Sequence, residues 1–214
     1  MQEICGAEHV SVAKTHLLAS SRDMWPRSLI AQRGRLAAPQ PEAVIWPADT
    51  EEVGKVLGLA AEFHMPIIPF GAGSGVCGGT LPVAGGWIVD VKRMNRILEL
   101  NEEDGLMRVE CGAMGEVLER ELQRRGWTLG HFPSSILCST VGGWVAGRSA
   151  GQCSSRYGKI EDMLRSLRWV DASGRIEDSP TWPAGFAPWS IDPLLAGSEG
   201  TLGVLCEAEL IVRP

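Results

Sequence analysis

The sequence contains no long apolar stretch, and no run approaches the roughly 18 residues that a membrane-spanning helix needs. Its first residues lack the basic segment followed by an apolar one that marks a secretory signal. Basic residues are not in surplus, because 20 lysines and arginines face 26 aspartates and glutamates, for a net charge of −6. These absences argue against a membrane-spanning protein, a secreted protein and a nucleic-acid binder.

Cysteine is present, but not in a metal-binding or disulfide pattern. The six cysteines form no C-x-x-C pair, and no histidine stands beside them at metal-ligand spacing. The pattern favours reduced thiols and a cytoplasmic location. With 214 residues, of which 44% are hydrophobic and 21% charged, the chain can form one large domain or two lobes that share a core.

The pattern of apolar residues predicts an α+β fold. Residues 1–42 carry little periodicity and are expected to be an N-terminal segment with a helix or two. A β-α-β unit with a parallel strand pair follows, and after about residue 98 the signals change to hairpins. The predicted elements are strands at 43–46, 67–70, 87–91 and 203–212, helices at 49–63 and 114–125, hairpins at 97–110 and 167–177, and a loop at 179–193.

Two helix faces can be assigned from the spacing. In the helix at 114–125, Val117, Leu118 and Leu122 are expected to face inward. Glutamates and arginines alternate at i,i+4 spacing on the same helix, as in Glu116/Arg120 and Glu121/Arg125. Such pairs are typical of a solvated helix face, not of a phosphate-binding patch.

A glycine-rich loop directly follows the second strand of the β-α-β unit. Gly71, Gly73 and Gly75 lack a Cβ, so successive backbone N–H groups can converge on an anion, and Ser74 adds a hydroxyl. A pyrophosphate site and a simple tight turn are about equally consistent with this pattern alone. A Rossmann site is rejected, because residues 76–86 contain four glycines and a proline where a crossover helix should begin.

Six segments in a fixed order resemble one known family, the PCMH-type or vanillyl-alcohol-oxidase-like FAD-linked oxidases. The segments are 69–79 (PFGAGSGVCGG), 85–97 (GGWIVDVKRMNRI), 111–113 (CGA), 139–146 (STVGGWVA), 156–162 (RYGKIED) and 197–203 (GSEGTLG). The sequence of residues 131–162 is most similar to the alkyldihydroxyacetonephosphate synthase branch. D-lactate and glycolate dehydrogenases belong to the same group.

The resemblance implies a PCMH-type FAD-binding fold of two α/β lobes, at 43–98 and 99–214, with the substrate-binding cap domain outside this chain. It also implies FAD as cofactor. We expect non-covalent binding, because no histidine lies in the glycine loop and Cys77 is expected to be a buried structural thiol.

Carried over position by position, the resemblance implies four groups of FAD contacts. They are Pro69, Phe70, Gly71, Ala72, Gly73, Ser74 and Gly75 for the pyrophosphate; Ser134, Ser135, Ile136, Leu137, Cys138, Ser139, Thr140, Gly142 and Gly143 for the flavin and its ribityl chain; Gly147, Arg148, Ser149 and Ala150 for the continuing wall; and Glu199, Gly200, Thr201, Leu202, Gly203, Val204 and Leu205 for the adenine side. Four of these positions depart from the family pattern, namely Ala72, Gly75, Ser134 and Gly147.

Several nearby residues have an ordinary structural interpretation. His131 is expected at the surface or in a capping role, although it stands at the edge of the flavin contacts. Arg148 and Arg156 are expected to form salt bridges unless they face a carboxylate or phosphate. Tyr157, the only tyrosine, is expected to pack in the core.

The resemblance implies an FAD-dependent oxidoreductase that oxidises a 2-hydroxy acid or related alcohol by hydride transfer to flavin N5. The catalytic base is expected in a cap domain or partner subunit, so that this chain alone would be inactive. Two alternatives stay open: a fragment of a non-redox alkyl-synthase-like flavoenzyme, and a non-catalytic FAD-binding subunit. The expected partners are a small-molecule substrate and, through an exposed apolar surface, a cap domain or a second copy of the chain.

Overall fold

The computed structural model describes residues 1–34, 39–179 and 191–214. The elements through residue 93 are α1 (Gln2–Cys5), η1 (Ala7–His9), β1 (Val10–Ser11), α2 (Lys14–Ala19), α3 (Pro26–Arg33), β2 (Ala43–Ile45), α4 (Thr50–Glu62), β3 (Ile67–Phe70), β4 (Trp87–Asp90) and η2 (Val91–Arg93). The later elements are β5 (Ile97–Asn101), β6 (Leu106–Glu110), α5 (Gly115–Arg124), η3 (Ile136–Cys138), α6 (Val141–Ala146), α7 (Ser154–Tyr157), α8 (Ile160–Met163), β7 (Leu164–Val170), β8 (Ile176–Asp178), α9 (Asp192–Leu195) and β9 (Val204–Ile211).

The first sheet has the strand order β1-β2-β4-β3. Strands β2 and β3 run parallel, as predicted, but each pairs with β4, which lies between them. The prediction that they form a pair was therefore wrong, because the loop after β3 is long enough to bring the chain back into the middle of the sheet. The crossover helix α4 begins as expected, since the Asp49 side chain accepts a hydrogen bond from the Glu52 amide at 2.8 Å.

The second sheet has the order β5-β6-β9-β7-β8 and is antiparallel throughout. Both predicted hairpins are confirmed, as β5–β6 and β7–β8. Charged side chains cross one face of the sheet, one from each strand and with alternating sign: Glu99, Arg108, Glu207, Arg168 and Asp178. The residues that alternate with them, such as Met107 and Val109, face the core. The larger sheet thus packs one face against the core and carries a row of charged side chains on the other.

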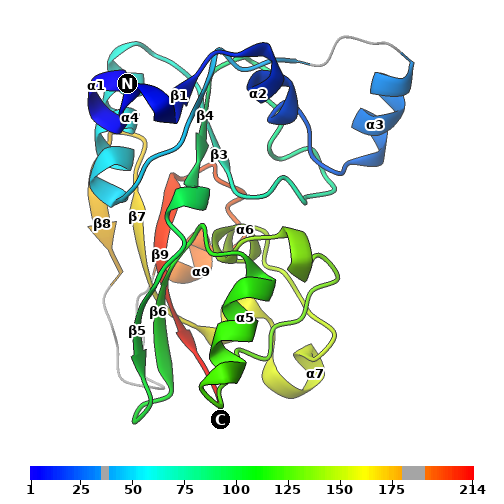
Figure 1. Cartoon of the computed structure of the whole chain (residues 1–214), viewed down its shortest axis with the longest axis vertical. Helices are drawn as coiled ribbons and strands as arrows, with labels where there is room; N and C mark the ends of the chain where they lie inside the picture. The colour runs from blue at the N-terminus through cyan, green and yellow to red at the C-terminus, as the bar shows by residue number, and fades with distance from the viewer. Residues whose placement is uncertain (35–38, 180–190) are drawn as a thin grey trace.

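The two sheets lie one above the other along the long axis of the molecule, with α5, α6 and α7 beside the larger sheet (Figure 1). One hydrophobic cluster fills the larger sheet's apolar side and includes Leu118 and Leu122 of α5. A second cluster contains Val53 and Val56 of α4 together with Val170 and Val204 of the larger sheet. The change of sheet occurs between β4 and β5, but the division into lobes near residue 98 stays a prediction, because this second cluster joins both sheets.

Two predictions about individual elements were wrong. Val117 is 62% exposed, because the buried stripe of α5 runs through Leu118 and Leu122 and a neighbouring residue is turned about 100° away. Helix α9 begins inside the predicted loop at 179–193, of which residues 180–190 lie outside the described part of the chain. The helices expected in the N-terminal segment are present, and the segment also carries the short edge strand β1, antiparallel to β2.

Candidate functional site

The glycine loop, residues 69–79, leaves a row of backbone donors unused. The amides of Gly73, Ser74, Gly75, Val76 and Cys77 donate no hydrogen bond to any described residue. Gly75, Val76 and Cys77 are exposed. Successive free N–H groups in a loop favour an anion, so this loop meets the requirement for holding a pyrophosphate.

The glycine loop touches the serine stretch, residues 134–150. A Cβ at Gly71 would overlap the Thr140 hydroxyl, so only glycine permits this approach. Thr140 caps α6 by accepting a hydrogen bond from the Gly143 amide at 3.4 Å. At Gly142 a Cβ would lie 2.9 Å from the Cys111 Cβ, so the start of α6 is held tightly against the core. The first turn of α6 therefore lies beside the glycine loop.

The third stretch, residues 197–205, meets the glycine loop from another side. At Gly200, whose φ is +79°, a Cβ would lie 3.0 Å from the Pro69 ring. At Gly79 a Cβ would lie 3.4 Å from the Glu199 carboxylate. Segments more than 100 residues apart in the sequence are thus in direct contact.

The third stretch is also hydrogen-bonded to the end of α6. The amides of Gly197 and Glu199 donate to the carbonyls of Val145 and Ala146, each at 3.0 Å. Both Glu199 (φ +50°) and Arg148 (φ +47°) adopt the left-handed conformation, which is uncommon outside glycine. Strained backbone of this kind concentrates at functional sites. The three stretches consequently form one continuous surface.

Arg148 does not form the predicted salt bridge within the described residues. Its Nε donates to the Ala196 carbonyl at 2.7 Å, and its Nη2 donates to the Pro193 carbonyl. The guanidinium therefore ties the end of α6 to α9, where backbone carbonyls are available in place of a carboxylate. Arg156 likewise stacks over the ring of Tyr157 at 4.9 Å. Tyr157 packs against the larger core, as predicted.

Burial varies among the residues expected to contact FAD. Buried are Phe70, Ser139, Thr140, Gly142, Val204 and Leu205; partly exposed are Pro69, Gly71, Ala72, Gly73, Ser74, Ser135, Ile136, Ser149, Gly200 and Gly203; exposed are Gly75, Ser134, Leu137, Cys138, Gly143, Gly147, Arg148, Ala150, Glu199, Thr201 and Leu202. The side chains of Val204 and Leu205 belong to the two core clusters. Any contact from these two residues to a ligand would therefore come from the backbone.

The expectation for Cys77 was wrong, because its thiol is exposed and not buried. The expectation for His131 was also wrong, since its side chain is buried. The His131 Nε2 lies 2.6 Å from the Ser149 hydroxyl, and its ring packs edge-on against Trp144 with centroids 4.8 Å apart. Burial lowers the pKa of His131 to about 4, against the weaker opposing effect of Glu161. A neutral His131 thus holds the wall that contains Ser149.

Sequence reasoning missed Lys92 as a support of the site. Its ammonium donates to the Gly71 carbonyl and to the Asp90 carboxylate, both at 2.6 Å, and lies 5.0 Å from the centre of the Phe70 ring. The indole of Trp46 donates to the same carboxylate at 3.0 Å. The only available signal was an acidic residue that ends β4, followed two positions later by a lysine.

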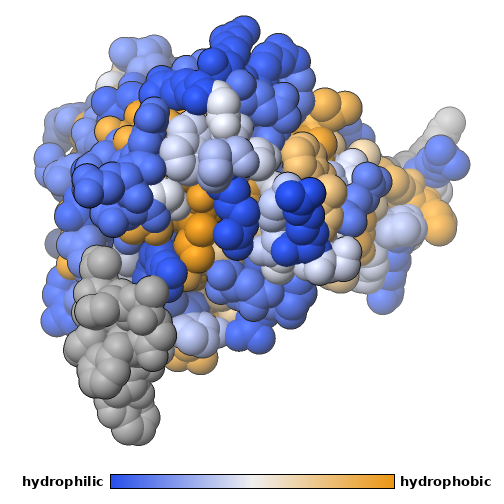
Figure 2. All heavy atoms as spheres, turned by 90° about the horizontal axis from the view of Figure 1, so that it is seen from below, coloured by the Kyte–Doolittle hydropathy of each residue, from blue (hydrophilic) through white to orange (hydrophobic). Residues whose placement is uncertain are grey.

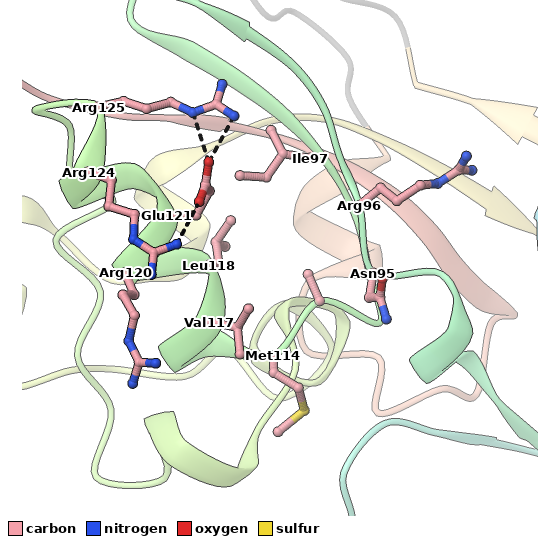
Figure 3. A pocket seen from close by; sticks show the side chains of 11 residues that line it. Asn95, Arg96, Ile97, Met114, Val117, Leu118, Arg120, Glu121, Arg124 and Arg125 are labelled. Carbon is pink, nitrogen blue, oxygen red and sulfur yellow. Dashed lines mark hydrogen bonds and ion pairs between the residues drawn. The ribbon is translucent and has the colours of Figure 1, made fainter.

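A separate hollow of about 440 Å³ lies between α5 and residues 95–97 (Figure 3). Its arginines are already engaged in ion pairs: Arg96 with Glu110, Arg120 with Glu116, and Arg124 and Arg125 with Glu121. These pairs confirm the predicted solvated face of α5. The hollow includes no residue of the three stretches.

Seen from below the view of Figure 1, the surface is mostly hydrophilic with apolar patches between (Figure 2).

Comparison with known proteins gives a consistent result. Residues 41–179 match a family described as "FAD binding domain". The chain is 34% identical to an alkyldihydroxyacetonephosphate synthase of Trypanosoma brucei brucei, over 91% of this chain and 32% of that protein. It is 36% identical to the glycolate oxidase subunit GlcD of Bacillus subtilis, over 83% of this chain and 39% of that protein.

A solved structure of an alkyldihydroxyacetonephosphate synthase superposes with a TM-score of 0.88 at 32% identity, over 97% of this chain and 38% of that one. The PCMH-type fold expected from the sequence is thereby confirmed. The chain spans about a third to two fifths of the length of these relatives. In the described residues, we find neither a cluster of metal-binding side chains nor a helix long and apolar enough to cross a membrane.

Proposed function

We propose that the glycine loop, the serine stretch and the third stretch together form the FAD site, because this chain belongs to the FAD binding domain family and FAD is therefore its cofactor. The convergence of three distant segments around unused backbone donors is the observation that carries this proposal. Free amides and a hydroxyl suit a pyrophosphate, and glycines at the contact points let the three segments approach one another closely.

In this proposal the glycine loop binds the pyrophosphate, and all three stretches present apolar side chains at the surface. The amides from Gly73 to Cys77 donate to the pyrophosphate, and Lys92 fixes the loop by holding the Gly71 carbonyl. Each stretch also exposes one large apolar side chain, Val76, Leu137 and Leu202 respectively. These side chains exclude water from the bound cofactor or contact the part of the enzyme that covers it.

FAD would be bound non-covalently. Because Cys77 is exposed, burial of its thiol does not argue against a covalent bond to the flavin. Non-covalent binding therefore needs a direct test. Acid denaturation of the loaded protein should release all flavin into the supernatant. Yellow colour that stays with the precipitated chain would show a covalent bond, and a Cys77→Ser variant would locate it.

The whole enzyme would be an FAD-dependent oxidoreductase that acts on a 2-hydroxy acid or related alcohol, which the similarity to GlcD supports. When bound, FAD supplies the hydride acceptor. This chain orients the cofactor and shields it from water. Buried His131 is engaged with Ser149 through its Nε2, so in this proposal the base comes from a cap domain or a partner subunit.

A second candidate is a non-redox flavoenzyme like alkyldihydroxyacetonephosphate synthase. It is favoured by the similarity to three such synthases, at 34–36% identity, and by the superposition on a solved one. Anaerobic mixing of the full enzyme with glycolate or D-lactate separates the candidates. Bleaching of the flavin supports the oxidoreductase, and unchanged colour with both acids favours the synthase or a non-catalytic FAD-binding subunit.

The FAD site itself is tested by a pair of lysine variants. Lys92→Met removes a charge-assisted hydrogen bond that holds the glycine loop, so we expect about tenfold weaker FAD binding, equivalent to about 1.4 kcal/mol. Lys55→Met is the matched control, because Lys55 is exposed on α4, outside the three stretches. Titration of FAD fluorescence measures both affinities, and the melting temperature without FAD checks folding. Equal affinities for the two variants would contradict the proposed site.

A further inference from the structure

We propose that the N-terminal segment completes the FAD site, with Asp23 as the residue that positions the glycine loop. The inference rests on the proposed function above and extends it to a part of the chain that precedes the family match, which begins at residue 41. Asp23 is only 2% exposed. Its Oδ2 accepts a hydrogen bond from the Gly78 amide at 2.7 Å, and its Oδ1 accepts one from the Trp25 amide at 2.9 Å.

Two further contacts join the same segments. The Met24 amide donates to the Gly75 carbonyl at 2.8 Å, so the loop is held at both Gly75 and Gly78. At Gly78, whose φ is +84°, a Cβ would lie 2.9 Å from the Trp25 ring. The indole therefore packs directly beneath the backbone of the loop. The free amides of Val76 and Cys77 lie between these two attachment points.

The N-terminal segment is itself anchored to the first sheet. Leu17 of α2 packs against the cluster of Val44, Phe70 and Ile88, and the Ser21 hydroxyl donates to the Leu17 carbonyl at 2.5 Å. Asp23 follows this anchor by two residues. A fixed carboxylate thus connects the sheet to the end of the glycine loop at Gly78, whereas Lys92 holds the beginning of the loop through the Gly71 carbonyl.

Such a brace matters because an unconstrained glycine-rich loop has many conformations, and ordering them on binding would weaken affinity. The sign of the effect separates positioning from simple electrostatics. A carboxylate near a pyrophosphate repels it, so neutralising Asp23 should strengthen binding if charge alone matters. If Asp23 acts by positioning the loop, neutralisation should weaken binding.

The test uses the complete chain with Asp23→Asn, which keeps the shape of the side chain but replaces one acceptor by a donor. We expect about tenfold weaker binding of FAD and of ADP, corresponding to loss of one hydrogen bond to a charged group. Binding of riboflavin, which lacks the pyrophosphate, should not change. Hydrogen exchange of residues 73–79 without ligand should become faster. Asp23→Ser, which retains an acceptor for Trp25 alone, should behave in the same way.

Glu3→Gln, on the exposed side of α1, is the control in the same segment and should leave all these values unchanged. Unchanged or stronger ADP binding by Asp23→Asn and Asp23→Ser, with a wild-type chain that binds normally, would overturn the role of Asp23. Equal loss of riboflavin binding would also overturn it, since that result indicates general unfolding. A wild-type chain that binds neither FAD nor ADP would instead refute the proposed function itself.

Discussion

The contact between Gly71 and Thr140 joins the glycine loop to the serine stretch, and a pair of substitutions can measure it. Gly71→Ala adds a methyl group that would overlap the Thr140 hydroxyl, while the Thr140 Cβ would lie 3.4 Å away. Overlap of this kind in a packed region costs about 1–3 kcal/mol of unfolding free energy. Thr140→Ala removes the hydroxyl and weakens the cap of α6, which costs about 0.5–1 kcal/mol given the long 3.4 Å hydrogen bond.

The double variant should be more stable than the sum of the two single effects predicts. With the hydroxyl removed, the added methyl at position 71 meets only a Cβ at ordinary contact distance. We therefore expect a favourable coupling of about 1–2 kcal/mol. Equilibrium unfolding in urea, followed by circular dichroism, gives the four free energies that the cycle requires.

Gly58→Ala is the matched control, because a methyl group there would lie 3.8 Å from the nearest atom, in the interior of α4. It should be neutral or stabilise the protein by up to about 1 kcal/mol. Strictly additive effects of Gly71→Ala and Thr140→Ala would refute the reasoning, since they would mean that the two stretches do not touch in solution.

Three other predictions follow from burial and charge. Between pH 6.5 and about 4, His131 is protonated in the unfolded chain but not in the folded one, so the free energy of unfolding should fall by up to about 3 kcal/mol on acidification. In urea titrations at several pH values, His131→Gln should reduce this dependence on pH. FAD should slow alkylation of exposed Cys77, whereas Cys206, whose pKa burial raises to about 12, should stay unreactive with or without FAD in peptide mapping. Asp178→Asn breaks a partly exposed ion pair with Arg168 and should lower the free energy of unfolding by less than about 1 kcal/mol. The melting temperature should therefore change little.

Much of the fold was predictable because its signals are local. The spacing of Val53, Val56 and Leu57 with the capping Asp49 defined helix α4, and turn residues between apolar runs defined both hairpins of the larger sheet. Close backbone approach requires glycines in the glycine loop and in the third stretch. These glycines are clustered, so they can be recognised in the sequence. Local periodicity and backbone freedom are properties of neighbouring residues, so they determined most of the elements, whereas the fold family and the cofactor class followed from the resemblance of six segments to a known family.

Only the tertiary structure decided which of these elements meet. Strand β4 lies between β2 and β3, Cys77 is exposed, and His131 is buried, because long-range pairing and burial depend on segments far apart in the chain. The supports of the glycine loop were missed for the same reason. Lys92 and Asp23 hold its backbone from two distant positions that carry no recognisable spacing, and a hydrogen bond between distant segments leaves no periodic trace in the sequence.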